Sequence, residues 1–135
     1  MSSMYLSKYS SLKKKFEKKE ATIGVVGLGY VGLPLAVMFA EAGFKVHGVD
    51  ISVQIIESLN KGSSHVGDVK DQKLLDLMEG NSVNKICFTS DYSALKSCDG
   101  IVICVPTPLS KTGNPDMRYV RDAGESISSN VSAGT

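Results

Sequence analysis

Residues 22–50 read TIGVVGLGYVGLPLAVMFAEAGFKVHGVD, and this stretch decides the fold of the chain. Residues 22–27 form a short apolar run, rich in β-branched side chains and ending in glycine, which is typical of a buried strand. Residues 30–42 follow with the length and composition of a helix, and Gly43 stands at the C′ position that commonly ends one. Residues 45–50 again resemble a strand. The stretch therefore predicts a strand–helix–strand unit with two parallel strands.

The rest of the chain continues this alternation. Further strands are predicted at residues 85–90 and 100–105, and further helices at residues 53–60, 72–79 and 116–131. Ser52, Asp71 and Asp91 carry the short polar side chains that cap helices, and Asp91 precedes a short helical segment at residues 92–97. Right-handed crossovers between parallel strands then predict an α/β fold, a Rossmann-type doubly wound parallel sheet with the strand order 3-2-1-4.

The chain divides into two parts by composition. Residues 1–20 are predicted to be a basic helical extension, and residues 21–135 an incomplete Rossmann domain. The last predicted helix should lead into a fifth strand, but the chain stops at Thr135. We therefore expect a sheet that is truncated before its later strands, either in the protein itself or because the sequence is partial.

The extension combines positive charge with a thin apolar stripe. Its six lysines outnumber Glu17 and Glu20, and its apolar side chains recur at helical spacing: Tyr5, Leu6, Tyr9, Leu12 and Phe16. Such a helix can lie on a membrane surface or bind a partner. It can also be a solvated helix that docks on its own domain or on a second copy, and the narrow stripe favours this interpretation.

The overall composition limits the classes of protein that the chain can represent. Hydrophobic residues make up 42% and charged residues 21%, as in ordinary globular domains. The net charge of +1 argues against a nucleic-acid-binding face, and no apolar run reaches the roughly twenty residues of a membrane span. No signal peptide is visible, so we expect a cytoplasmic protein without nucleic-acid or membrane partners.

The cysteines and histidines indicate no metal site. Cys87, Cys98 and Cys104 contain no CxxC pair and are expected to be reduced, buried thiols in strands. His47 and His65 are isolated along the chain, so neither completes a cluster with metal-ligand spacing.

The sequence GLGYVG fits the pattern G-x-G-x-x-G and lies between the first strand and the first helix. Gly27 allows a tight turn, Gly29 lets a pyrophosphate approach the backbone, and Gly32 lets the helix pack against the strand. The free N–H groups of the first helical turn then face the phosphates of a dinucleotide. The alternative is that these glycines serve only the turn.

Asp50 ends the second strand, eighteen residues after Gly32. A carboxylate at this place accepts hydrogen bonds from the adenosine ribose and repels a 2′-phosphate. Residues 51–55 contain no Lys or Arg that could hold such a phosphate, so the sequence favours NAD over NADP as cofactor. The alternative for Asp50 is a simple helix cap, although Ser52 is better placed for that.

The fourth strand delivers Pro106 and Thr107 to the switch point of the sheet, where ligands bind. The prolines on both sides of Thr107 hold the loop extended and present its hydroxyl beside the cofactor. The alternative is a rigid loop with an incidental threonine. Asp116, Arg118 and Asp122 are expected on the solvated face of the last helix.

The segments 24–51 and 89–120, with the spacing between them, resemble the UDP-glucose/GDP-mannose dehydrogenase family. The glycine loop extended as GYVGLP and the turn VPTPL are specific in combination, and the resemblance covers residues 20–135. The finer pattern PTPLSK-x-x-x-PD-x-x-YV and the N-terminal extension are most similar to the branch that oxidises UDP-N-acetylglucosamine or a related UDP-N-acetylhexosamine.

The resemblance implies the NAD-binding portion of an enzyme that oxidises the C6 alcohol of a UDP-sugar to a carboxylate with two NAD. It implies NAD contacts from the glycine loop with Tyr30 and Val31, from Asp50 and from Thr107. The catalytic cysteine, lysine and asparagine of the family belong to a central helix and a substrate domain beyond residue 135. The chain is therefore expected to hold no catalytic residue, and the full-length protein to form a homodimer.

One position departs from the family pattern, because Ile55 stands where members often carry a basic residue near the adenosine. Two other functions remain open. The chain could be the corresponding domain of a β-hydroxyacid or 6-phosphogluconate dehydrogenase, against which the VPTPL turn argues. It could also be a free-standing, non-catalytic NAD-sensing module.

Overall fold

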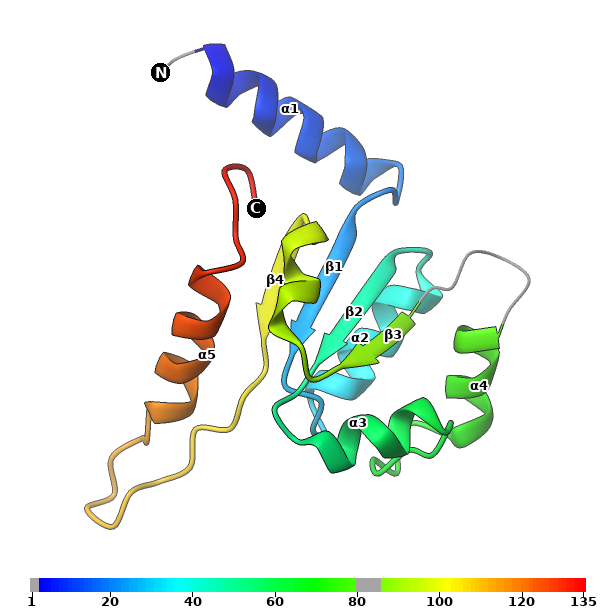
Figure 1. The fold of residues 1–135 in the computed structure, drawn as a ribbon, viewed down its shortest axis with the longest axis vertical. Coiled ribbons are helices and arrows are strands. Elements are labelled where there is room, and N and C mark those ends of the chain that lie inside the picture. Colours follow the sequence, from blue (N-terminus) through cyan, green and yellow to red (C-terminus); the bar gives the residue numbers. More distant parts are fainter. Residues whose placement is uncertain (1–2, 80–85) are drawn as a thin grey trace.

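The computed structural model describes residues 3–79 and 86–135, which form an α/β fold (Figure 1). The strands of this part are β1 (Thr22–Val26), β2 (Lys45–Val49), β3 (Ile86–Thr89) and β4 (Gly100–Ile103). The helices are α1 (Ser3–Glu17), α2 (Gly32–Glu41), α3 (Val53–Asn60), α4 (Asp71–Glu79), the 3₁₀ helix η1 (Tyr92–Ser97) and α5 (Arg118–Ser128). Each predicted element is confirmed with small shifts at its ends; the predicted first residue of β3, residue 85, lies outside the described residues.

The sheet is parallel throughout and has the order β3-β2-β1-β4, as predicted. Val26 near the end of β1 is level with Val49 of β2 and with Ile103 of β4. The strands therefore end together, and their carboxyl ends form one edge of the sheet. β1 lies between β2 and β4, where the winding direction reverses, so this edge contains the switch point at which such sheets bind ligands.

Two apolar layers stabilise the sheet from opposite faces. Helices α2, α3 and α4 cover one face, where Leu33, Leu59 and Leu74 are fully buried. On the other face, η1 and α5 contribute Leu95 and Ile127 to a smaller cluster. The larger layer fixes α2 against β1 and thereby sets the position of the loop that joins them.

The predicted caps are confirmed at two of three positions. The Ser52 hydroxyl accepts a hydrogen bond from the N–H three residues on (3.3 Å), and the Asp91 carboxylate from the N–H two residues on (2.9 Å). The prediction for Asp71 is wrong, because it is the first residue of α4 and its carboxylate instead accepts from the Ser64 N–H at 2.8 Å. The loop before α4 folds back on the helix, so the carboxylate binds the loop.

β4 is shorter than predicted and ends at Ile103. The Cys104 N–H still donates to the Val26 carbonyl at 2.7 Å, but Pro106 has no N–H with which to extend the ladder. The chain therefore leaves the sheet at its carboxyl edge and runs along a loop that a bridge between Leu109 and Pro115 closes.

Asp116 does not lie on a solvated helix face as predicted, and only 14% of its side chain is exposed. Its carboxylate binds the Arg118 guanidinium at 2.7 Å and the Arg118 N–H at 3.1 Å. These two contacts lower the pKa of Asp116 to about 2. The carboxylate thus holds the first residue of α5, although the N-cap residue of that helix is Met117.

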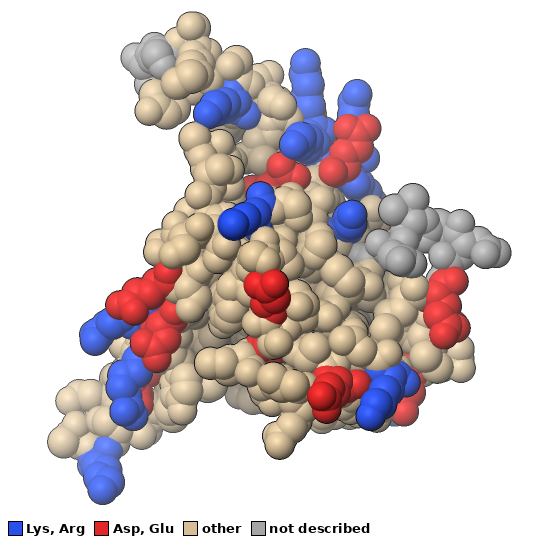
Figure 2. All heavy atoms as spheres, in the orientation of Figure 1, with Lys and Arg blue, Asp and Glu red and all other residues tan. Residues whose placement is uncertain are grey.

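α1 contacts the sheet near its C-terminal end, and its middle turns face the C-terminal residues 132–135 across a shallow pocket. The Phe16 ring lies 6.0 Å from the Phe44 ring, and Lys15 Nζ is 3.0 Å from an Asp99 carboxylate oxygen. The preceding turns project from the domain with Tyr5 and Tyr9 exposed, and Figure 2 shows lysines gathered over this helix. Among the described residues no helix is both long and apolar enough to cross a membrane.

Candidate cofactor site

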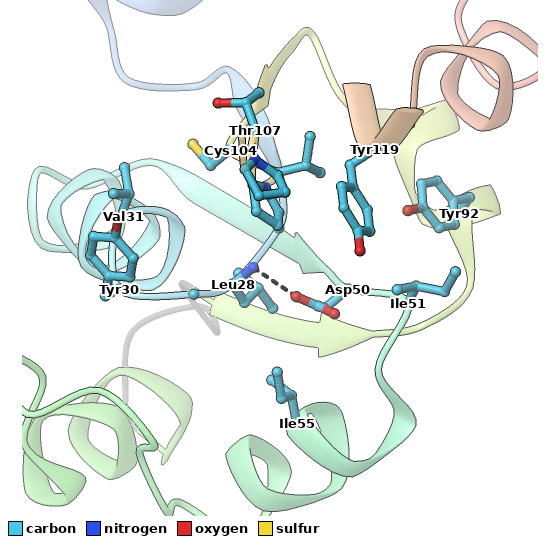
Figure 3. A pocket seen from close by; sticks show the side chains of 15 residues that line it. Leu28, Tyr30, Val31, Asp50, Ile51, Ile55, Tyr92, Cys104, Thr107 and Tyr119 are labelled. Atoms are coloured by element: carbon cyan, nitrogen blue, oxygen red, sulfur yellow. Dashed lines mark hydrogen bonds between the residues drawn. The ribbon is translucent and has the colours of Figure 1, made fainter. Parts of the chain in front are cut away.

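A cavity of about 770 Å³ opens at the carboxyl edge of the sheet (Figure 3). The glycine loop after β1, the end of β2, the start of η1, the loop after β4 and the start of α5 contribute to its wall. All the predicted cofactor residues except Gly32 line it: Gly27, Gly29, Tyr30, Val31, Asp50, Pro106 and Thr107. The fold therefore brings together residues that lie up to eighty positions apart in the sequence.

Gly27 makes the turn out of β1 as predicted. Its φ is +95°, in the left-handed region that favours glycine. A Cβ atom here would lie 2.5 Å from the carbonyl oxygen of Cys104, in the chain that leaves β4. The residue thus serves both the turn and the close passage of the two loops at the switch point.

Gly29 and Gly32 differ in what surrounds them. A Cβ atom on Gly32 would collide with the carbonyl group of Gly27, so only glycine lets α2 start directly beneath the turn. A Cβ atom on Gly29 would meet no atom within 4 Å, and its φ is not in the left-handed region. The fold therefore requires glycine at Gly27 and Gly32, whereas the space at Gly29 is open toward the cavity.

The loop between β1 and α2 presents a row of free donors. Counting from Gly29, Leu33 is the first residue whose N–H donates a hydrogen bond to the protein. Its acceptor is the Gly29 carbonyl, at 3.0 Å. Within the described part of the chain, the N–H groups of residues 29–32 donate to no protein atom. Unpaired N–H groups at a helix start attract anions, so the loop fits a pyrophosphate. Tyr30 and Val31 offer only their backbone, because their side chains are exposed at the rim.

Asp50 stands at the end of β2 and reaches the glycine loop. One carboxylate oxygen accepts from the Leu28 N–H at 2.8 Å and the other from the Ser52 N–H at 2.9 Å (Figure 3). Each oxygen has a second lone pair, so the carboxylate can accept further hydrogen bonds from ribose hydroxyls. No ion pair of the described residues includes Asp50.

The sequence reasoning missed the apolar end of the cavity. Tyr92 of η1 and Tyr119 of α5 lie beyond Asp50 on the side of Ile51, and Ile55 lies below them (Figure 3). Burial and the nearby Asp50 carboxylate raise the pKa of Tyr92, so its hydroxyl keeps its proton. Aromatic and aliphatic groups of this kind suit a flat heterocycle. Ile55, which departs from the family pattern, lines the cavity here, and its side chain extends this apolar surface.

At the other end of the cavity, the loop after β4 passes above the glycine loop. Pro106 and Thr107 are exposed there, and Cys104 is half-buried beside them. The Asp116 N–H donates to the Pro108 carbonyl at 2.7 Å, which ties the end of the loop to its beginning. Thr107 thus lines the cavity immediately before the segment that this bond closes.

The cysteines differ from the expectation of buried strand thiols. Cys87 is exposed on edge strand β3, on the face opposite to the buried Ile86 and Phe88, and Cys98 follows η1 instead of lying in a strand. Burial raises the pKa of all three thiols, including Cys104, and that of Cys98 reaches about 11. None of them is a thiolate poised for nucleophilic attack. The described residues contain no cluster of three metal-ligating side chains.

Comparison with known proteins points to one family. The sequence model of the UDP-glucose/GDP-mannose dehydrogenase family, NAD binding domain, matches residues 21–135. The chain is 36% identical over 113 residues to a UDP-N-acetyl-D-mannosamine dehydrogenase of Pyrococcus horikoshii, covering 83% of this chain and 26% of that protein. It is 43% identical over 107 residues to the UDP-glucose 6-dehydrogenase TuaD of Bacillus subtilis, covering 78% and 23%.

The fold agrees with these similarities. The solved structure of the UDP-D-ManNAc dehydrogenase from Pyrococcus horikoshii superposes with a TM-score of 0.76 at 35% identity, covering 84% of this chain and 27% of that one. The chain thus spans about a quarter of the length of the relatives that it matches.

Proposed function

The chain belongs to the UDP-glucose/GDP-mannose dehydrogenase family, whose NAD-binding domain it matches, and we propose that it serves the oxidation of a UDP-sugar C6 alcohol to a carboxylate. Its cofactor is NAD. When bound, NAD accepts the hydride that the alcohol carbon gives up. The chain itself binds and orients the cofactor, because burial raises the pKa of its three cysteine thiols and none of them is activated as a nucleophile.

The observation that carries this proposal is the open space at Gly29 between free N–H donors and the Asp50 carboxylate. Gly27 and Gly32 are glycines because the turn would otherwise clash, but no neighbouring atom requires Gly29 to be one. A pyrophosphate that approaches the backbone is the physical reason that remains. The donors at residues 29–32 and the acceptor at Asp50 supply the hydrogen bonds that a phosphate and a ribose need.

These residues also suggest the direction in which NAD lies. Asp50 has the chemistry for the adenosine ribose, so we place the adenine beyond it, between Tyr92, Tyr119 and Ile55. The nicotinamide then lies at the opposite end, beneath Thr107. The uncompensated carboxylate of Asp50 repels a 2′-phosphate, which supports NAD over NADP.

We further propose that the sugar is a UDP-N-acetylhexosamine. The pattern PTPLSK-x-x-x-PD-x-x-YV and the extension at residues 1–20 support this branch. The relatives include dehydrogenases of both UDP-N-acetyl-D-mannosamine and UDP-glucose, so the choice among sugars rests on those segments. The homodimer and the division into residues 1–20 and 21–135 stay predictions.

Two measurements test the proposal. Calorimetric titration of the chain should show NAD binding, and the chain mixed with NAD and UDP-sugars should show no sustained rise in reduced-nicotinamide absorbance. The natural protein that contains this chain should reduce two NAD for each sugar acid that it forms from UDP-N-acetylglucosamine or UDP-N-acetylmannosamine. Its turnover should be slower with UDP-glucose. A chain that binds no NAD, or that turns over alone, would contradict the proposal.

A further inference from the structure

His65 reaches the glycine loop from the segment between α3 and α4. Its Nε2 atom lies 2.7 Å from the carbonyl oxygen of Leu28. A carbonyl oxygen only accepts hydrogen bonds, so the hydrogen is on Nε2 and the histidine is the donor. Neither the family pattern nor the motif quoted for the loop assigns a task to this residue.

The histidine is held in place on both sides. The preceding residue, Ser64, donates its N–H to the Asp71 carboxylate at 2.8 Å. The following residue, Val66, is buried in the main core. The Ser64 hydroxyl also bonds the backbone of Val66, which closes a compact turn around the histidine. The backbone on both sides of His65 is therefore anchored, and its exposed side chain reaches Leu28 from this fixed turn.

Leu28 thus has both backbone groups bound by side chains from other elements. Its N–H donates to Asp50, and its carbonyl accepts from His65. These two bonds orient two successive peptide planes, between Gly27 and Leu28 and between Leu28 and Gly29. In a trans peptide the C=O and the N–H point in opposite directions, so the Gly29 N–H must point away from His65. It begins the row of free donors at residues 29–32.

We propose that His65 is a positioning residue for NAD, because its bond to the Leu28 carbonyl aims the Gly29 peptide at the pyrophosphate. The inference rests on the proposed function, since it assigns the loop donors to NAD. Asp50 and His65 orient two neighbouring peptides of the loop, the first from the end of β2 and the second from the segment between α3 and α4. A donor that is already aimed loses less conformational entropy when the phosphate binds, so the bond should raise affinity without touching the cofactor.

The test compares three variants by calorimetric titration with NAD, well below the lowest thermal midpoint. His65→Ala removes the donor, whereas His65→Gln keeps an N–H at a similar reach. His47→Ala is the matched control, because it removes the other histidine, whose Nδ1 faces Cys87 at 3.1 Å. The loss of one ordering hydrogen bond predicts an increase of about three- to tenfold in the Kd of His65→Ala. His65→Gln should stay within about twofold of the parent, and His47→Ala should be unchanged.

The outcomes separate this inference from the proposed function. A parent chain without NAD affinity would overturn both. A parent that binds NAD while His65→Ala binds equally well would overturn the inference alone. Equal weakening in the Ala and Gln variants would also overturn it, because a lost side chain and not a lost donor would then be the cause.

Discussion

The two edges of the sheet each carry an aspartate, and the two carboxylates are used differently. At the amino edge, Asp99 accepts from the Thr22 N–H at 2.9 Å and from Lys15 Nζ at 3.0 Å. At the carboxyl edge, Asp50 accepts from the N–H groups of Leu28 and Ser52, and no cation of the described residues pairs with it. One charge is neutralised within the fold, and the other remains facing a cavity.

The difference shows how an edge becomes a binding site. At the amino edge, Lys15 and Phe16 of α1 contact Asp99 and Phe44, so the charge and the aromatic ring there have partners within the chain. At the carboxyl edge, the backbone N–H groups of residues 29–32 stay free and Asp50 keeps its charge. Groups left unsatisfied together, in a concave place, are the ones that a polar ligand can bind.

The largest expected effect is on stability, and it compares two glycines, one at each edge, that differ in the space available to a Cβ atom. Gly32→Ala forces a Cβ atom into the Gly27 carbonyl, so the carboxyl edge must rearrange and stability should fall by about 3 kcal/mol. Gly100→Ala at the amino edge meets only the tip of the Phe16 ring at 3.2 Å, which can shift. Urea unfolding of both variants provides the measurement. Equal loss in the two would show that the turn is not the tighter site.

The next effect compares the two aspartates directly. Asp50→Asn removes the charge that binds ribose and repels a 2′-phosphate, so NAD affinity should fall about thirtyfold and the gap between NAD and NADP should narrow. Asp99→Asn changes a carboxylate that faces Lys15, so the ratio of the two affinities should stay as in the parent. Calorimetry with both cofactors decides. An unchanged ratio in Asp50→Asn would reduce Asp50 to a structural bond to Leu28.

A smaller effect, also at the carboxyl edge, separates what the fold requires at Gly29 from what NAD binding requires there. Gly29→Ala adds a methyl group where the fold has room, so stability should stay or rise by about 0.5 kcal/mol. The displaced pyrophosphate should nevertheless weaken NAD binding about tenfold. Gly67→Ala is the control, because it is equally open but lies outside the cavity. A Gly29→Ala variant that melts early yet binds NAD normally would mean that Gly29 serves the turn alone.

The smallest effect belongs to the amino edge. Lys15→Met removes an ion pair in which the lysine side chain is 46% exposed, so stability should fall by about 0.5 kcal/mol, and less in high salt. NAD affinity should not change. Chemical denaturation at two salt concentrations, with Lys14→Met as a matched surface lysine, measures this. A loss of NAD affinity would show that the two edges are coupled through the sheet.

The parts of the site that could be predicted from sequence are those that local patterns fix. The turn at Gly27 follows from a strand that ends in glycine before a helix, and Asp50 from its place at the end of the next strand. Asp71 was mispredicted because a residue of capping type can bind a loop instead. Cys87 was mispredicted because an apolar run does not reveal which face of an edge strand stays uncovered.

Tyr92, Tyr119 and His65 could not be assigned from the sequence. Tyr119 is the tyrosine of the PD-x-x-YV pattern, but the pattern does not say where its ring lies. The three residues reach the cavity or its loop from three different connections of the chain. A tyrosine in η1 has no local signal that distinguishes it from a core residue. The positions become meaningful only when the crossovers bring η1, α5 and the loop before α4 to the same edge of the sheet.

The sequence by itself determined the order of the strands, the glycine turn and the acid that follows β2, because each depends on hydrophobic periodicity and on backbone conformations that few residues allow. The tertiary structure alone decided that Gly29 stands in open space while Gly32 does not, and that His65 and Asp50 bind the same residue. These facts depend on distances between segments far apart in the chain, and no local pattern encodes such distances.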